Sequence, residues 1–298
     1  VQDNSYVLMD KKVHELQMSL KEIEKGGYPF FMLKEIFEQP KTIGDSLRGR
    51  IQPEEGKIVL GGLTEVMDKL HGARRIIIAA CGTSWHSSLV AEYLFEDLAQ
   101  IPVEVEYASE FRYKNPLIYP DDIVIVVSQS GETADTLAAL NYAKEKNYLS
   151  TLTICNVPTS SLARESDFSL FTNAGPEIGV ASTKAFTTQL AGLMLLALSL
   201  AKSRGLNPKL RGRIVQALRL LPETIAEALN SKDQMIEIAP NIANKNNALF
   251  LGRGIFYPIA KEGALKLKEI SYIHAEASFS STIANALPES SFFTLPYP

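Results

Sequence analysis

Long apolar runs alternate with amphipathic stretches through the middle of the chain. From residue 75 the sequence reads RIIIAAC, then SWHSSLVAEYLFEDLAQ with apolar residues every three or four positions, then VEVEYA, DDIVIVVS and TADTLAALNYAKEKN. The alternation continues through LSTLTICN and FSLFTN to TKAFTTQLAGLMLLALSLAKSRG. Short apolar runs between helical patterns predict parallel strands covered by helices on both faces. We therefore expect an α/β fold, a three-layer sandwich of flavodoxin-like type around a five-stranded parallel sheet.

The N-terminal residues do not show this strand and helix alternation. Residues 11–27 (KKVHELQMSLKEIEKGG) have a helical pattern that ends at two glycines. Residues 30–50 (FFMLKEIFEQPKTIGDSLRGR) form a second amphipathic stretch, which we expect to be interrupted at Pro40. Residues 1–50 are therefore predicted to be a linker that docks on the α/β domain C-terminal to it.

The C-terminal part begins the alternation again. Residues 207–245 predict helices only, after which ALFLGRG and YPIAKEGALKLKEIS repeat the order of strand, glycine loop and helix. This repetition predicts the start of a second, incomplete domain of the same kind. After Ala277 the sequence shows no strand and helix rhythm.

Charge and composition narrow the range of partners. The net charge is −4, so a nucleic-acid partner is not expected and an anionic ligand must be held by local amides and hydroxyls. Cys81 and Cys155 each end an apolar run without metal-ligand spacing, so we expect no metal, no cofactor and no disulfide. No signal-peptide pattern is present, and the apolar stretch 190–201 is short for a membrane span. We expect a buried or interface helix there, no membrane association and a cytoplasmic setting.

The first candidate loop follows the first predicted strand. In Cys81-Gly82-Thr83-Ser84, the glycine permits a tight turn and two hydroxyls reach a helix N-terminus, where free amides attract anions. The alternative is that Ser84 only caps the helix.

The second candidate loop is SQSGET, residues 128–133. Three hydroxyls and one amide gather around a glycine before a helix, which suits a phosphate monoester. The lysine of a P-loop is missing. The alternative is a capping box from Ser130 to Thr133.

Two further elements carry candidate chemistry. In GVASTK, residues 179–184, either Ser182 or Thr183 caps the next helix or the loop closes over sugar hydroxyls. Later, Glu269 lies three residues after Lys266 and could move a proton as a general base if it faced a pocket. Its neighbour Glu262 could equally form a surface pair with Lys266. His274 is either a proton carrier or structural.

Taken together, these motifs resemble one family. CGTS, ASEFRY, SQSGETADTL, ICNVP, SSLARESD, EIGVASTKAFTTQL, FLGRG and EGALKLKEISYIHAEA occur in the order found in the glucosamine-6-phosphate synthases, the isomerizing glutamine–fructose-6-phosphate transaminases. Upstream, KEIFEQP and GRI resemble the linker between the family's glutaminase and isomerase domains. The resemblance covers residues 10–277 and implies the SIS (sugar isomerase) fold, which normally occurs twice.

The resemblance also implies a reaction. Family members make glucosamine 6-phosphate from fructose 6-phosphate and ammonia, which a glutaminase domain releases from glutamine, and they are homodimers or larger. On this basis Glu269 is the proton-transferring base and Lys266 a supporting catalytic residue. The substrate-binding residues implied are Ser128, Gln129, Ser130 and Thr133 for the phosphate, and Thr83, Ser84, Val180 and Ser182 for the sugar chain.

Several departures from the family pattern limit what this chain should do. The nucleophilic cysteine of the glutaminase has no counterpart, because Cys81 belongs to the sugar loop, so we do not expect glutamine hydrolysis. After HAEA the chain reads SFSSTIANALPESS, without the ring-opening histidine, and the imine-forming lysine is not found either. We therefore expect sugar-phosphate binding with weak or absent turnover.

We divide the chain accordingly and keep two alternatives. The predicted parts are 1–70 as linker and tail of a glutaminase domain, 71–210 as the first SIS domain, 211–245 as a helical connection and 246–298 as the incomplete second SIS domain. One alternative is a non-catalytic sugar-phosphate sensor, although residues 1–70 offer no basic recognition helix. The other is a phosphosugar deglycase or another ketose isomerase on the same fold.

Overall fold

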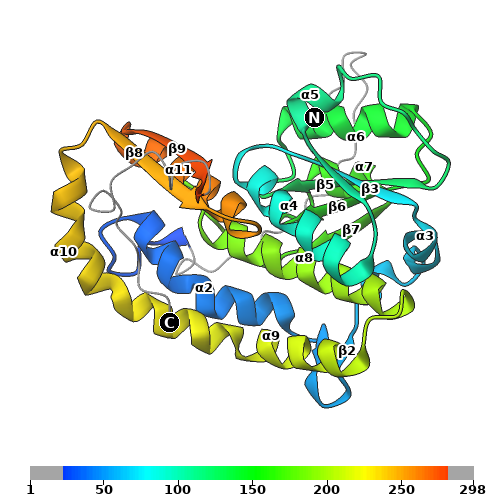
Figure 1. Ribbon diagram of the computed structural model, residues 1–298, viewed down its shortest axis with the longest axis horizontal. Helices are drawn as coiled ribbons and strands as arrows, with labels where there is room; N and C mark the ends of the chain where they lie inside the picture. The colour runs from blue at the N-terminus through cyan, green and yellow to red at the C-terminus, as the bar shows by residue number, and fades with distance from the viewer. Residues whose placement is uncertain (1–22, 281–298) are drawn as a thin grey trace, which may run out of the picture.

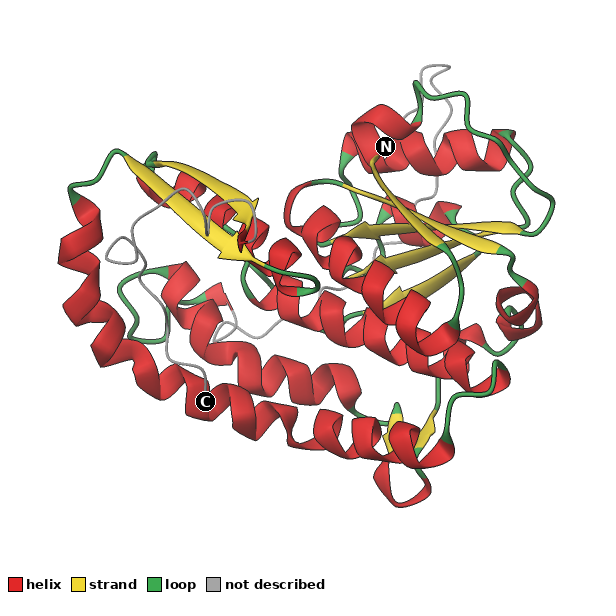
Figure 2. Cartoon of the chain, in the orientation of Figure 1, coloured by secondary structure: helices red, strands yellow, loops and turns green. Residues whose placement is uncertain are grey.

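A five-stranded parallel sheet with helices on both faces lies beside a smaller strand–helix–strand unit (Figures 1 and 2). The structure is a computed structural model, and it describes residues 23–280. The strands of the large sheet are β3 (Arg75–Ala80), β4 (Val103–Tyr107), β5 (Asp122–Ser128), β6 (Ser150–Cys155) and β7 (Phe168–Phe171). This architecture confirms the predicted α/β fold and its five strands.

The order of the strands determines where a ligand can bind. The order across the sheet is β4-β3-β5-β6-β7, and all neighbours are parallel. The chain therefore proceeds in one direction from β3 to β4 and in the other direction from β5 onward. In parallel sheets, ligands bind beyond the carboxyl ends of the strands at such a reversal. Here the reversal lies between β3 and β5.

Both faces of the sheet are apolar because both are covered. Ile76 and Ile78 of β3 pack into one core cluster, whereas Ile77 and Ala79 pack into the other. Every residue of β5 and β6 is buried. The first face is covered by α4 (Gly82–Leu94), the π-helical turn η3 (Phe95–Ala99) and α8 (Lys184–Ser203); the second is covered by α5 (Ala108–Phe111), α6 (Ala134–Glu145) and α7 (Ser161–Glu165). The sequence pattern did not predict α5 and α7, which are only one turn long.

Helix α8 is the apolar stretch that the sequence analysis assigned to the interior. Within residues 23–280 it is the one helix long and apolar enough to cross a membrane, with a mean hydropathy of 1.4. However, 72% of that apolar window is buried inside the fold, where Leu193, Leu195 and Leu196 join the core. The prediction of a buried helix is confirmed.

The N-terminal helix corrects one expectation. Helix α2 (Phe31–Leu47) runs without interruption through Pro40. A proline cannot donate to the carbonyl four residues earlier, here that of Ile36. The side-chain amide of Gln39 donates to that oxygen instead, at 3.0 Å. The predicted break is therefore wrong, because a neighbouring side chain replaces the lost hydrogen bond. Residues 11–22 of the other predicted N-terminal helix lie outside the described residues.

Short elements connect α2 to the sheet, and long helices follow it. A small hairpin and three short helices precede β3, namely β1 (Ile51–Gln52), η1 (Pro53–Glu55), β2 (Lys57–Ile58), η2 (Gly61–Leu63) and α3 (Met67–Gly72). After α8 come α9 (Pro208–Ala228), η4 (Leu229–Ser231) and α10 (Lys232–Ala243). The all-helical prediction for residues 207–245 is confirmed. Helix α2 packs between α8 and α9, consistent with a docked linker.

The smaller unit consists of β8 (Asn247–Gly252), α11 (Phe256–Ser271) and β9 (His274–Phe279). The two strands are parallel, and α11 packs on both of them and also on α4 (Figure 1). The sequence predicted β8 and α11 but not β9, whose HAEASF mixes small and polar residues. The departure after Ala277 falls mostly on residues 281–298, outside the described part. The domain boundaries at 70, 210 and 245 remain a prediction.

One buried carboxylate connects α2 to a loop beside the sheet. The side chain of Glu35, which is 2% exposed, accepts hydrogen bonds from the backbone amides of Ile178 (2.6 Å) and Gly179 (3.0 Å). A Cβ on Gly179 would lie 2.5 Å from that carboxylate, so the close approach requires glycine there. The loop that contains Val180 and Ser182 is thereby held by the linker helix.

We predict that Glu35→Ala lowers the free energy of unfolding by about 1–2 kcal/mol, because it removes a buried carboxylate that accepts from two part-buried amides. Urea unfolding of the purified chain measures this change. Glu35→Gln keeps one acceptor oxygen and serves as the matched control, with a smaller loss expected. An Ala variant as stable as the wild type would contradict the role given to this carboxylate.

Candidate functional site

A cavity of about 220 Å³ opens where the strand order reverses. The loops after β3 and β5 form one side of it, the loop before α8 forms another, and α11 closes it. All ten residues that the family resemblance implied as catalytic or substrate-binding line this cavity: Thr83, Ser84, Ser128, Gln129, Ser130, Thr133, Val180, Ser182, Lys266 and Glu269. Cys81, Val127 and Thr136 line it as well. The topology therefore brings together residues that lie up to 188 positions apart in the sequence, from Cys81 to Glu269.

The loop after β5 presents hydroxyls around a tight turn. The hydroxyl of Ser128 accepts from the amide of Gly131 at 3.1 Å and lies 3.2 Å from that of Thr133. Ser130 accepts from the amide of Glu132 at 3.2 Å. Thr133 is the N-cap residue of α6, but its side chain makes no capping hydrogen bond. The alternative of a capping box from Ser130 to Thr133 is therefore wrong, because both hydroxyls bond within the loop.

Gly131 is required by the shape of this loop. Its φ is +68°, in the left-handed region that other residues avoid. A Cβ there would lie 2.1 Å from the hydroxyl oxygen of Ser160, a buried residue that caps α7. Glu132, next to it, binds the amide of Ser161 at 2.7 Å, and this hydrogen bond lowers the pKa of the carboxyl group. The loop is thus fixed against α7 on its outer side.

Thr136 was missed by sequence reasoning, although it lies one turn inside α6. Its side chain is fully buried and lines the cavity, yet its hydroxyl oxygen has no hydrogen-bond partner among residues 23–280. A buried hydroxyl without a partner costs free energy. Together with the α6 N-terminus, it gives the cavity unused donors that suit an anion. Its spacing of three from Thr133 was the available signal, because that spacing places both on one helix face.

In the loop after β3, Ser84 does not cap the helix that follows. Helix α4 begins at Gly82, so Ser84 lies inside the helix rather than at its cap. Its hydroxyl accepts from the side-chain amide of Gln189 at 2.9 Å, and Gln189 in turn accepts from Ser87 at 2.9 Å. The capping alternative for Ser84 is wrong. The hydrogen bonds to α8 fix the rotamer of this cavity residue.

The loop before α8 is held by a carboxylate that sequence reasoning overlooked. Glu177 accepts from the amide of Thr183 (2.8 Å), from that of Ala185 (3.2 Å) and from the hydroxyl of Ser182 (2.8 Å). It thus caps α8 in place of Ser182 or Thr183, neither of which does so. The side chain of Val180 is 99% exposed at the rim of the cavity.

The charged residues of α11 form a network at the far wall of the cavity. The ammonium of Lys266 lies 2.6 Å from a carboxylate oxygen of Glu269, 3.5 Å from Glu262 and 3.2 Å from the hydroxyl of Thr83. Glu262 is only 6% exposed, and it also accepts from Thr83 (2.9 Å) and lies 2.6 Å from Nδ1 of His86. The alternative that Glu262 forms a surface pair with Lys266 is therefore wrong. Glu262 is buried and connects α11 to α4.

His274 does not belong to this site. It lies on β9, its side chain is 66% exposed, and its nearest charged partner is Glu276 at 3.5 Å. Within residues 23–280 no group of three or more His, Cys, Asp or Glu residues is arranged to hold a metal ion. Among the residues that the structure describes, Lys266 is the one cationic residue that lines the cavity.

Comparisons with known proteins agree with this geometry. The family model of the SIS domain matches residues 69–199 and 241–291. The chain is 42% identical, with a TM-score of 0.84, to the C-terminal domain of glucosamine-fructose-6-phosphate aminotransferase from Francisella tularensis, over 88% of this chain and 74% of that one. The chain belongs to the SIS family, within the isomerizing glutamine–fructose-6-phosphate aminotransferases.

Longer relatives support the same membership. The isomerizing glutamine–fructose-6-phosphate aminotransferase of Chlorobaculum tepidum is 54% identical over 270 residues, 91% of this chain and 44% of the relative. The Escherichia coli enzyme of the same name is 52% identical over 255 residues, 85% of this chain and 42% of that enzyme. The chain thus spans a little under half the length of these relatives, and it corresponds to their SIS portion.

The two cysteines of this SIS chain should differ in reactivity. Cys155 is fully buried, and burial raises the pKa of its thiol, whereas Cys81 is partly exposed at the cavity. The thiolate is the reactive form, so a buried thiol reacts slowly. We predict that Ellman's reagent labels one thiol per folded chain and that Cys81→Ser removes this reaction.

The matched variant Cys155→Ser should leave the rapid labelling unchanged. Labelling that persists in Cys81→Ser would show that reagent reaches Cys155, and no labelling of the wild type would show that the cavity is closed to solvent. Either result would contradict the geometry described above.

Proposed function

We propose that this chain is the sugar-phosphate isomerase part of a glucosamine-6-phosphate synthase. Its substrate would be fructose 6-phosphate, its nitrogen donor ammonia derived from glutamine, and its product glucosamine 6-phosphate. The observation that supports this most is the cavity around which three strand-end loops and α11 meet. That cavity combines a hydroxyl-rich loop with a lysine–carboxylate pair, which is what phosphate binding and proton transfer require.

In this proposal the phosphate binds to the loop after β5. Ser128, Gln129, Ser130 and Thr133 supply neutral donors, and the N-terminus of α6 supplies free amides and the positive end of its dipole. The unpartnered hydroxyl of Thr136 would gain an acceptor. Such a site binds a dianion without a lysine, in agreement with the net negative charge of the chain.

The sugar chain would extend from the phosphate across the cavity towards α11. Thr83, Ser84, Val180 and Ser182 would contact its hydroxyls and backbone. The loop with Val180 is attached to α2 through Glu35, so the linker helix would help to position one wall of the sugar site.

Proton transfer is the chemical task of Glu269. Once ammonia has replaced the ketose oxygen, the base would remove a proton from C1 of the ketimine and return it at C2, which gives the amino aldose. No proton is gained or lost overall. Lys266, 2.6 Å from the carboxylate, would hold Glu269 in position, and Thr83 would fix Lys266 from the other side.

The remaining parts of the proposal concern the intact protein. We infer that a glutaminase domain supplies the ammonia, that two copies associate as a homodimer, and that the protein works in the cytoplasm. The sequence after Ala277 departs from the family pattern, so we expect this chain to bind the sugar phosphate but to turn it over slowly.

We predict that fructose 6-phosphate binds saturably to the chain in a calorimetric titration. Ser130→Ala should weaken binding about tenfold, because it removes a donor to a charged group. Thr136→Val should weaken it similarly, and it should not lower the stability of the free protein, because the hydroxyl has no partner to lose among the described residues.

Ser231→Ala, an exposed serine on η4 outside the cavity, is the control and should bind like the wild type. Unchanged affinity for fructose 6-phosphate in both Ser130→Ala and Thr136→Val would show that the phosphate does not bind to this loop.

We further predict that Glu269→Gln abolishes exchange of the C1 proton of fructose 6-phosphate with deuterated solvent while the dissociation constant changes by less than about threefold. Proton NMR over long incubations measures even slow exchange. Glu276→Gln, a surface carboxylate on β9, is the matched control. Exchange at the wild-type rate in Glu269→Gln would exclude this residue as the base.

A further inference from the structure

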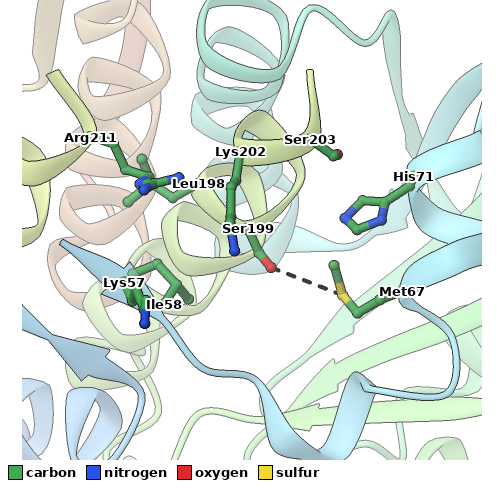
Figure 3. A pocket seen from close by; sticks show the side chains of 9 residues that line it. All are labelled: Lys57, Ile58, Met67, His71, Leu198, Ser199, Lys202, Ser203 and Arg211. Atoms are coloured by element: carbon green, nitrogen blue, oxygen red, sulfur yellow. Dashed lines mark hydrogen bonds between the residues drawn. The ribbon is translucent and has the colours of Figure 1, made fainter. Parts of the chain in front are cut away.

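A second cavity lies at the opposite end of α8 from the sugar site. Its volume is about 320 Å³, within the range of small-molecule sites. It is lined by Lys57, Ile58, Met67, His71, Leu198, Ser199, Lys202, Ser203 and Arg211 (Figure 3). The sugar loop precedes Lys184, whereas this cavity adjoins residues 198–203, so roughly 20–25 Å of helix separates the two sites.

The lining of this cavity is cationic, unlike the chain as a whole. Its cations are Lys57 from β2, Lys202 from the last turn of α8 and Arg211 from the first turns of α9, and His71 of α3 lies beside them. None of the nine described residues that line it is acidic, whereas the net charge of the chain is −4. Cationic groups that converge without a counter-charge repel one another, and a bound anion relieves this repulsion.

The protein itself neutralises these groups only in part. Lys57 pairs with Glu55 at the surface. Nε of Arg211 donates to the carbonyl of Gly56 at 3.0 Å, which leaves the two terminal nitrogens of the Arg211 guanidinium to bind a ligand. Among residues 23–280 the ammonium of Lys202 makes no hydrogen bond or ion pair. In Figure 3, Lys202 lies between Arg211 and Lys57 on one side and His71 on the other. The position of Lys202 also complements the negative end of the α8 dipole, but that dipole amounts to about half a charge.

The rest of the wall is apolar or carries a hydroxyl. Ile58, Met67 and Leu198 provide an apolar surface beside the cations. Among residues 23–280 the hydroxyl of Ser199 has one partner, the weak acceptor Sδ of Met67 at 4.0 Å, and it can turn to a better one. A ligand that fits both halves of this wall has an anionic head and a small apolar body.

We propose that this cavity is a second anion site, which binds a phosphate monoester with a small apolar body. Lys202 and Arg211 bind the phosphate oxygens, Ser199 donates to them, and the body packs on Met67 and Ile58. Because the lining residues come from the hairpin, α3, α8 and α9, an occupant would tie these four elements together. The site is separate from the sugar cavity and does not depend on the function proposed for it.

Two histidines make the two cavities distinguishable in one experiment. His71 lines the second cavity, and His86 adjoins the sugar site through Glu262. We therefore propose titrating phenyl phosphate into protein labelled with ¹³C at histidine, following the ring signals of His71 and His86. The expected result is a saturable shift of His71, at a lower concentration than inorganic phosphate requires. An equal response to both would overturn the apolar-body part of the proposal.

Variants test whether the site is specific. Lys202→Gln should raise the dissociation constant read from His71 on the order of threefold to tenfold, and Arg211→Gln should do the same. The response of His86 to fructose 6-phosphate should be unchanged in both, which shows that the fold is intact. Lys69→Gln, an exposed α3 residue outside the cavity, is the charge-matched control. No shift of His71 in the wild type, or equal weakening by Lys69→Gln, would overturn the proposal.

Discussion

The arrangement of the site depends on one buried carboxylate. Glu262 accepts from Thr83, lies 2.6 Å from His86 and lies near Lys266, so it joins α11 to the first helix of the large sheet. A buried charge of this kind is tolerated only while its partners remain in place. A cation–π contact strengthens the same joint, because Lys261 of α11 lies over the Trp85 ring of α4, and Trp85 is itself stacked on Tyr107 of β4. Without this joint the lysine–carboxylate pair would have no fixed place beside the hydroxyl loop.

The sheet provides the other half of the geometry. Because the strand order reverses between β3 and β5, the loops after these two strands diverge and leave space between them. Gly131 permits the sharp turn that directs the hydroxyls of one loop into that space. The network of Glu262 then places Lys266 and Glu269 opposite. The loop after β5 and helix α11 belong to separate strand–helix units, and together they can hold the two ends of one ligand.

Much of this could be predicted from the sequence, because parallel strands and their helices have strong periodic patterns. The loops at strand ends could be identified for the same reason, since their hydroxyls and glycines interrupt long apolar runs. Features that depend on contacts between distant segments could not be predicted. The burial of Glu262 and the hydrogen bonds of Glu35 to the Val180 loop each require the tertiary fold. The capping of α8 by Glu177 is instead a local contact, with residues six and eight positions further along the chain, that the sequence pattern did not reveal. The unbroken helix at Pro40 depends on how the Gln39 side chain turns, which no pattern encodes. Strand β9 was missed because its residues show neither period clearly.

Membership of the isomerizing aminotransferase family agrees with this arrangement of loops and helices. The chain carries the SIS portion of proteins more than twice its length, and the cavity at the strand reversal combines a hydroxyl-rich loop with a lysine–carboxylate pair. The second, cationic cavity at the other end of α8 is a separate feature of the same helix. Its occupant would contact the hairpin that comes after α2, and α2 in turn holds the Val180 loop.

A crystal structure of this chain with fructose 6-phosphate bound tests most directly whether the cavity at the strand reversal holds the sugar phosphate. We expect the phosphate to lie against residues 128–133 and the N-terminus of α6, and C1 and C2 to face the carboxylate of Glu269. A phosphate bound beside Lys266 instead, or a sugar whose C1 and C2 point away from α11, would contradict this expectation.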